Sequence, residues 1–204
     1  MNYQKELEII LEKIKESKFT PKLLLHACCG PCSSYCLEYL SQYFDITILY
    51  YNPNIYPDLE YNRRFNELKR FINEIPRINK IELMESRYDP KEYYWSVKGL
   101  ENLGERSKRC YECYKLRMEE TAKVALENNF DYFTTTLSIS PYKDANWINE
   151  IGINLEKRYG VKYLYADFKK KNGYKRSIEL SRQYNMYRQD YCGCVYSKIE
   201  SEKK

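Results

Sequence analysis

The eight cysteines of this 204-residue chain fall into three short groups whose spacing suits metal or redox chemistry. The groups are Cys28, Cys29, Cys32 and Cys36 in HACCGPCSSYC, Cys110 and Cys113 in RCYEC, and Cys192 and Cys194 in CGC. Thiolates are the ligands of iron–sulfur clusters and of structural zinc. Such closely spaced thiols therefore indicate one or more metal or redox sites.

Cys110 and Cys113 form a C-x-x-C pair at the start of a predicted helix. Residues three apart lie on the same face of a helix, so both sulfurs can point to one centre. The amino end of a helix also lowers the pKa of a thiol and favours the thiolate that metals require. The basic residues Arg106, Lys108 and Arg109 act in the same direction.

Cys28 and Cys29 follow a predicted buried strand and precede a turn at Gly30-Pro31. In a regular strand the two side chains would point to opposite faces of the sheet, but a turn would let both face one centre. With Cys110 and Cys113 they make four thiolates, the complement of a 4Fe–4S cluster or of a structural zinc. The alternative is that some of these thiols are buried and inert.

Cys192 and Cys194 are separated by a single glycine, which permits the tight turn that a disulfide between them would need. Such a bridge would be strained and easily reduced, which suits a redox-active pair. The alternative is that both thiolates hold a second metal together with Cys32. Cys32 follows Gly-Pro at a predicted helix start, where a lowered thiol pKa is expected.

His26 and Cys36 are expected mainly to be packing residues rather than parts of the metal or redox site. His26 is the only histidine, and a histidine at a strand end is usually a buried, hydrogen-bonded residue. Its alternative role is a contact with the metal site or a proton donated to a substrate. Cys36 lies mid-helix near Leu37 and Leu40, so we interpret it as a packing residue.

The elements that must position these thiols alternate between strand and helix. Apolar runs predict strands at residues 22–27, 45–52, 80–86, 130–136 and 161–168. Apolar residues at helical spacing predict helices at 2–17, 32–44, 61–75, 118–126, 141–159 and 174–187. This alternation indicates an α/β fold, a single domain with a mostly parallel sheet flanked by helices. Ligands bind such sheets at the carboxyl ends of the strands, where Cys28 and Cys29 fall.

The predicted organisation is an N-terminal helix over residues 1–20, an α/β catalytic domain with the metal site over 21–196, and a frayed tail over 197–204. The opening MNYQKELEII lacks the basic and then apolar pattern of a secretory signal, and no apolar run reaches membrane-spanning length. We therefore expect a soluble, cytoplasmic protein. The net charge of +5 and the 23 tyrosines weakly favour contact with RNA.

Three further stretches carry hypotheses about substrate contact. YYNPNIYP, residues 50–57, is either a rigid polar substrate loop or an ordinary turn. TTTLSISPYKD, residues 134–144, could receive a phosphate, although helix capping by Ser140 explains its serine equally well. In the basic segment 167–177, Lys169, Lys170 and Arg176 are candidates for a phosphate contact, against the alternative of a solvated surface.

Six of these segments together resemble the epoxyqueuosine reductase family of the non-cobalamin type. They are HACCGPC, YNPNIYP with EYNRR, RCYECYKLR, TTTLSISPYKD, DFKKKNGYKRS and YRQDYCGC, in this order along the chain. The resemblance runs from Lys22 to Cys194, so only the N-terminal helix and the last residues lie outside it.

The resemblance implies an iron–sulfur enzyme that needs no corrin. It would reduce the epoxide on the cyclopentane ring of epoxyqueuosine, at the wobble position of tRNA, to the alkene, which is the last step of queuosine synthesis. By motif match the ligands of a 4Fe–4S cluster would be Cys28, Cys29, Cys110 and Cys113. Cys192 and Cys194 would form a redox-active disulfide or bind an additional iron beside the cluster, and Cys32 lies where it could join that second site.

The fold that the resemblance implies is similar to the adenine-nucleotide hydrolase class. The glycine-rich ATP loop S-G-G-x-D-S of that class is absent after the first strand, where HACCGPC stands instead, so ATP-driven chemistry is not expected. The implied partners are a tRNA bearing epoxyqueuosine in its anticodon loop and an electron donor that the sequence does not identify. No membrane partner is expected.

Removing the epoxide oxygen as water consumes two electrons and two protons. A 4Fe–4S cluster passes electrons singly, so a dithiol pair or an additional iron nearby would be useful. Tyr191, Tyr142 and His26 are proton-donor candidates by their position in the chain. Two rival functions are a tRNA sulfur transferase of the same fold class, which would need nucleotide activation, and a zinc-stabilised RNA-binding module without catalysis.

Overall fold

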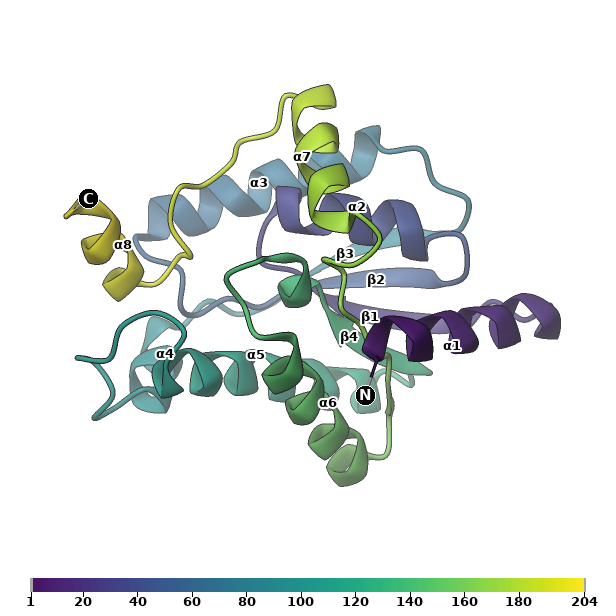
Figure 1. The fold of residues 1–204 in the computed structure, drawn as a ribbon, viewed down its shortest axis with the longest axis horizontal. Coiled ribbons are helices and arrows are strands. Elements are labelled where there is room, and N and C mark those ends of the chain that lie inside the picture. Colours follow the sequence, from purple (N-terminus) through teal and green to yellow (C-terminus); the bar gives the residue numbers. More distant parts are fainter. Residues whose placement is uncertain (1, 204) are drawn as a thin grey trace.

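One parallel sheet of five strands, in the order β3-β2-β1-β4-β5, organises the chain (Figure 1). The computed structural model describes residues 2–203. The strands are β1 (Lys22–His26), β2 (Asp45–Tyr50), β3 (Ile81–Glu85), β4 (Tyr132–Thr135) and β5 (Lys162–Tyr163). The helices are α1 (Tyr3–Ser17), α2 (Gly30–Leu40), α3 (Asp58–Glu74), α4 (Pro90–Ser96), α5 (Lys108–Glu127), α6 (Ala145–Tyr159), α7 (Gly173–Gln183) and α8 (Val195–Glu202), with a 3-10 turn η1 (Thr136–Ile139). The predicted single α/β domain is confirmed.

The central strand β1 is apolar on both faces, as expected for a parallel strand covered by helices on each side. Leu23 and Leu25 belong to one core layer, which contains side chains of α1, α2 and α3. Leu24 belongs to the other layer, which contains side chains of α5 and α6. Figure 1 shows α2 and α3 on one side of the sheet and α5 and α6 on the other, with α7 beside α2.

Helix α6 shows how local chemistry fixes the element boundaries near the site. Its first turn is capped by Asp144, whose carboxylate accepts the N–H of Asn146 at 2.7 Å. Ser140 therefore does not cap this helix, although the sequence allowed it. The helix ends at Gly160, whose left-handed φ of 75° is strain-free for glycine.

The fifth strand is much shorter than the predicted range 161–168. Only Lys162 and Tyr163 pair with β4. Beyond them the chain leaves the sheet, and its backbone forms hydrogen bonds with the side chain of Asn149. Asn149 of α6 accepts the N–H of Ala166 at 3.1 Å and donates to the Ala166 carbonyl at 2.9 Å. These two bonds replace the ladder bonds that a longer edge strand would have made.

Of the segment 197–204, predicted to be a frayed tail, residues 197–202 are helical as part of α8, and Lys204 lies outside the described residues. Cys194 caps this helix, Ser197 is buried, and Glu200 forms an ion pair with buried Arg109 at 3.1 Å. These contacts hold the segment against the domain, so the prediction of fraying is wrong over residues 197–202. Helix α4 and the turn η1 were not predicted either.

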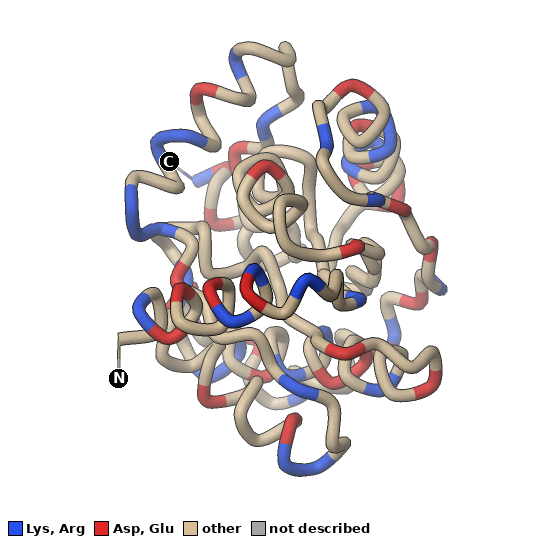
Figure 2. The backbone as a smooth tube through the Cα atoms, turned by 90° about the vertical axis from the view of Figure 1, so that its right-hand side faces the viewer, with Lys and Arg blue, Asp and Glu red and all other residues tan. Residues whose placement is uncertain are grey.

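Figure 2 shows acidic and basic residues interspersed along the tube in that view. Within residues 2–203, no helix combines the length and the apolar character that crossing a bilayer requires.

Helix α1 is an integral part of the core, because Leu7 and Leu11 are buried in the same layer as Leu23. We expect Leu7→Ala to lower the free energy of unfolding by about 2–5 kcal/mol, since it leaves a cavity in a packed layer. The matched change Ile9→Ala, at a side chain that is 40% exposed, should cost less than about 1 kcal/mol. Urea unfolding monitored by circular dichroism measures both, and equal losses would contradict the docking of α1.

Candidate metal and redox site

A cavity of about 310 Å³ opens beyond the carboxyl ends of β1 and β4, the edge at which the sequence placed the site. Four helices direct their amino ends to it, and each contributes a lining residue near that end. These residues are Cys32 of α2, Cys110 of α5, Tyr174 of α7 and Ser197 of α8. Free N–H groups and the positive ends of helix dipoles favour anions at such a place.

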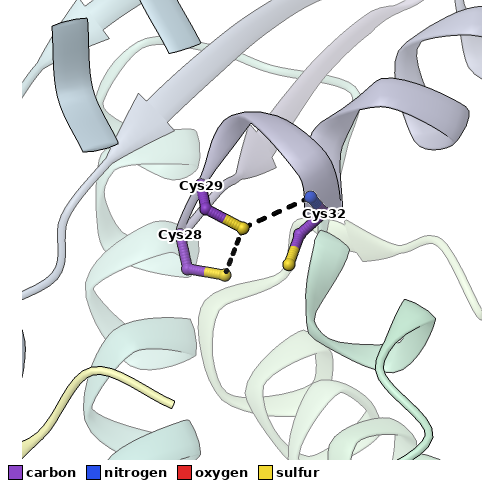
Figure 3. Close-up of side chains that lie close together, drawn as sticks. All are labelled: Cys28, Cys29 and Cys32. Carbon is purple, nitrogen blue, oxygen red and sulfur yellow. Dashed lines mark hydrogen bonds between the residues drawn. The ribbon is translucent and has the colours of Figure 1, made fainter. Parts of the chain in front are cut away.

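The first cysteine group is compact. The sulfurs of Cys28, Cys29 and Cys32 all lie within 4.8 Å of one another (Figure 3). Cys29 caps α2, because its sulfur accepts the backbone N–H of Cys32 at 3.2 Å, and the Cys28 sulfur lies 3.9 Å from it. The helix starts at Gly30-Pro31, so the predicted turn is the first turn of α2.

The three thiols of this group hold their protons unequally. Hydrogen bonds from Cys29 and Cys32 lower the pKa of Cys28 well below its ordinary value. Burial raises the pKa of Cys29 to about 12, and the hydrogen bond to Cys28 raises that of Cys32. The group is therefore arranged to hold a thiolate at Cys28, which is the form that binds metals.

The second pair is divided between the cavity and an apolar cluster behind it. Cys110 lines the cavity together with Cys28, whereas Cys113, one turn further along α5, is buried against Tyr93 and Cys194. Burial raises the pKa of Cys110 and raises that of Cys113 to about 12. These two sulfurs lie outside the compact group of Cys28, Cys29 and Cys32.

The C-G-C segment reaches the cavity from the opposite end of the sequence. Cys192 is exposed and lines the cavity, while Cys194 is buried and caps α8 by accepting the N–H of Ser197 at 3.4 Å. Gly193 has a φ of 134°, and a Cβ there would lie 3.0 Å from a guanidinium nitrogen of Arg64. The position thus requires glycine for its backbone conformation and for space. All eight cysteines are free thiols in the structure.

Arg64 of α3 anchors the backbone of the C-G-C segment. Its side chain is 1% exposed and donates to the carbonyl oxygens of Cys192 at 3.1 Å and Tyr191 at 3.3 Å. Glu60, one turn earlier, accepts a third bond from it at 2.6 Å and balances its charge. The 50–57 loop adds a backbone bond, from the Tyr56 N–H to the Gly193 carbonyl at 2.8 Å.

Arg117 of α5 tests whether the site suits an anionic metal centre. The side chain is 2% exposed; its Nε donates to the Cys113 carbonyl at 3.1 Å, and its Nη2 is buried without a partner among the described residues. Burial lowers the pKa of Arg117, but the sulfurs of Cys113 and Cys28 raise it above its ordinary value. A buried cation with an unused donor beside cysteine sulfurs fits a metal bound by thiolates.

Lys143 supplies a second positive charge at the cavity wall. Burial lowers its pKa, but the nearby sulfurs of Cys192 and Cys28 raise it well above its ordinary value. The cavity therefore combines the acidic thiol of Cys28 with cations from different elements, which is the electrostatic pattern of an anion-binding or redox site.

Comparison with known proteins identifies the family. The family described as "Epoxyqueuosine reductase QueH" matches residues 23–200. This chain belongs to that family. Proteins named "Epoxyqueuosine reductase QueH" from Streptococcus pyogenes serotype M1 and from Staphylococcus epidermidis are each 43% identical to it. The alignments cover 97% and 98% of this chain, and 78% and 86% of the respective relatives.

One solved structure with a related arrangement is described as a predicted subunit of tRNA methyltransferase from Methanocaldococcus jannaschii. It is 15% identical, covers 78% of this chain and 74% of its own, and has a TM-score of 0.49.

The proton-donor candidates expected for an epoxyqueuosine reductase lie in different surroundings. His26 is fully buried between Thr135 and the Tyr51 carbonyl, and burial lowers its pKa to about 4, so it is a neutral packing residue outside the cavity lining. Tyr191 lines the cavity, but its hydroxyl donates to the Tyr56 carbonyl at 2.5 Å. Tyr142 also lines the cavity, and its side chain is exposed.

The other candidate substrate contacts are mostly engaged in ion pairs or hydrogen bonds within the protein itself. Lys169 forms an ion pair with Asp167, and Arg176 forms one with Glu38. Lys170 is exposed, which leaves it open to a phosphate. The 50–57 loop supports the C-G-C segment rather than lining the cavity.

Sequence reasoning did not single out three residues that the geometry places at the site. Arg117, Lys143 and Gln189 lie within motifs characteristic of the epoxyqueuosine reductase family, but nothing in a motif shows which way its side chains point. Cys36, in contrast, is fully buried in the main core, as predicted.

We expect Arg64→Met to lower the free energy of unfolding by about 3–5 kcal/mol, because it leaves Glu60 as a buried charge without its partner. It should also release Cys192, whose alkylation by iodoacetamide would become faster. The matched control is Arg182→Met, at an exposed position in the last turn of α7. Unchanged alkylation of Cys192 in the Arg64 variant would contradict the anchoring role.

Proposed function

We propose that this chain reduces epoxyqueuosine to queuosine at the wobble position of tRNA, by a two-electron deoxygenation of the epoxide at an iron–sulfur site. Family membership over residues 23–200 supports the reaction. The observation that carries the site is the meeting of Cys28, Cys32, Cys110 and Cys192, from three distant regions of the sequence, in one cavity.

The proposed cluster ligands are Cys28, Cys29, Cys110 and Cys113. A four-iron cluster holds its thiolates farther apart than a single ion does, so ligands outside the compact group, such as Cys110 and Cys113, are compatible with it. The buried guanidinium of Arg117 supports an anionic group between α5 and α2. When bound, a 4Fe–4S cluster supplies single electrons to the reaction.

The proposed second redox element comprises Cys32, Cys192 and Cys194. Either Cys192 and Cys194 cycle between dithiol and disulfide, or the three thiols hold an additional iron beside the cluster. Cys32 and Cys192 line the same cavity, which supports a shared role. Gly193 and Arg64 hold the C-G-C backbone in place for either chemistry.

The residues of the cavity would orient the substrate and deliver protons. Tyr142 is the proposed proton donor to the departing epoxide oxygen, because it lines the cavity and its ring is exposed. Lys143 would stabilise the negative charge that develops on that oxygen. The proposed partners are a tRNA bearing epoxyqueuosine in its anticodon loop and a separate electron donor, both in the cytoplasm.

We expect Cys28→Ala and Cys113→Ala to yield protein without a cluster and without activity, since each removes a proposed ligand. The matched control is Cys36→Ala, which removes a buried thiol from the core and should keep both. After anaerobic purification, visible absorption together with iron and sulfide counts of about four each measures the cluster. Reduction of epoxyqueuosine tRNA with a chemical reductant measures the activity.

Two results would overturn the assignment. A Cys28 or Cys113 variant that remains fully loaded and active would remove these residues from the ligand set. A colourless wild-type protein that holds zinc, and takes up no iron on reconstitution, would instead favour a zinc-stabilised RNA-binding module, for which the compact group of Cys28, Cys29 and Cys32 would suffice.

For the second redox element, we expect Cys192→Ser to abolish reduction of epoxyqueuosine while leaving about four irons and four sulfides. If the three thiols hold an additional iron, the wild type should contain more iron than sulfide, and the variant should lose only this excess. A redox disulfide predicts equal counts and two thiols that disappear on mild oxidation of the wild type. Full activity in the Cys192 variant would contradict both.

A further inference from the structure

Gln189 lies at the cavity and contacts a proposed cluster ligand directly. Its side-chain nitrogen Nε2 is 3.1 Å from the sulfur of Cys29, across 160 residues of sequence. The same sulfur accepts the backbone N–H of Cys32 at 3.2 Å. Cys29 therefore has two N–H donors, and Gln189 provides the one that a mutation can remove.

The backbone around Gln189 is held on both sides, so the position of its amide is fixed by the fold. Before it, the Tyr187 N–H donates to Glu67 of α3 at 3.0 Å. After it, Arg64 donates to the Tyr191 carbonyl at 3.3 Å. A side chain placed between two anchors loses little freedom when it bonds to the sulfur.

An amide N–H donated to a ligand sulfur has a defined redox consequence. Reduction adds negative charge to a cluster and its thiolates, and a hydrogen bond to a sulfur stabilises that charge. A metal-bound thiolate carries no proton, so the amide of Gln189 has to be the donor in this pair. The bond consequently favours the reduced state of the bound cluster.

The other end of the same amide is unused. The Oε1 atom of Gln189 is buried and has no hydrogen-bond partner among the described residues, although the residue lines the cavity. An unpaired buried carbonyl oxygen is costly unless a ligand satisfies it. A hydrogen bond accepted at Oε1 also polarises the amide and strengthens its N–H as a donor.

We propose that Gln189 is a positioning residue that couples substrate binding to the redox potential of the site: its Nε2–H donates to the Cys29 sulfur, and its Oε1 accepts a hydrogen bond from an N–H or O–H of the bound substrate. This inference rests on the proposed function, because it takes Cys29 as a cluster ligand. It assigns Gln189 no chemical step of its own.

The test compares the loaded wild type with Gln189→Leu by potentiometric titration of the cluster. Loss of the N–H donor should lower the equilibrium constant for one-electron reduction about tenfold, which corresponds to about 59 mV. The matched control is Gln183→Leu, at the exposed end of α7, and it should leave the potential unchanged. An unchanged potential in a fully loaded Gln189 variant would overturn the proposal.

The coupling has its own readout, in which tRNA carrying the product queuosine serves as an unreactive ligand. Saturation with this tRNA should raise the potential of the wild-type cluster and should leave that of Gln189→Leu unchanged. Equal responses of the two proteins, or no response of the wild type, would overturn the substrate contact at Oε1.

A second measurement needs no variant and remains decisive where Gln189→Leu does not load. Wild-type protein grown with glutamine labelled with ¹⁵N in the side-chain amide should show a weak ¹⁵N coupling to the reduced cluster in pulsed electron paramagnetic resonance. Absence of that coupling would overturn the proposal while leaving the reductase assignment intact. A wild type that binds no iron–sulfur cluster would instead refute the proposed function itself.

Discussion

The site depends on placing positive potential beside cysteine thiols that are held away from bulk water. Burial alone raises the pKa of a thiol, as it does for Cys113, so the fold has to supply positive potential in return. Three helices place a cysteine at or near their amino ends, in α2, α5 and α8, and buried Arg117 adds a full charge. This requirement explains why the thiols occur at helix starts rather than within strands.

The same requirement shapes the rest of the architecture. The parallel sheet brings the starts of α2 and η1 to one edge, but it cannot by itself bring the C-G-C segment there. Helix α3 performs that task through Arg64 and Glu67, whose partners lie more than a hundred residues later. Helix α8 completes the enclosure, because the ion pair between Glu200 and Arg109 holds it to α5. The position of the C-G-C segment therefore depends on its supports in α3 and α8.

Much of the fold could be predicted because the signals are local. The run KLLLH identifies a strand buried on both faces, and the position of Cys28 after it identifies the functional edge. The helical state of residues 197–202 could not be predicted, since it depends on a distant partner, Arg109. The contact of Gln189 with Cys29 is likewise set by tertiary packing across 160 residues. The sequence thus identified the cysteines, whereas the residues that contact and support them became visible only in the folded structure.

The long sequence separations within the cavity also constrain the order in which the protein can mature. Contacts between residues as distant as Cys29 and Gln189 form late in folding, because the loop between them must close first. The thiols at the start of α2 therefore pass through a period in which they have been synthesised but are not yet covered by the C-terminal segment. During that period only the reducing power of their surroundings protects them from oxidation. Assembly of the proposed metal centre would accordingly follow folding rather than nucleate it.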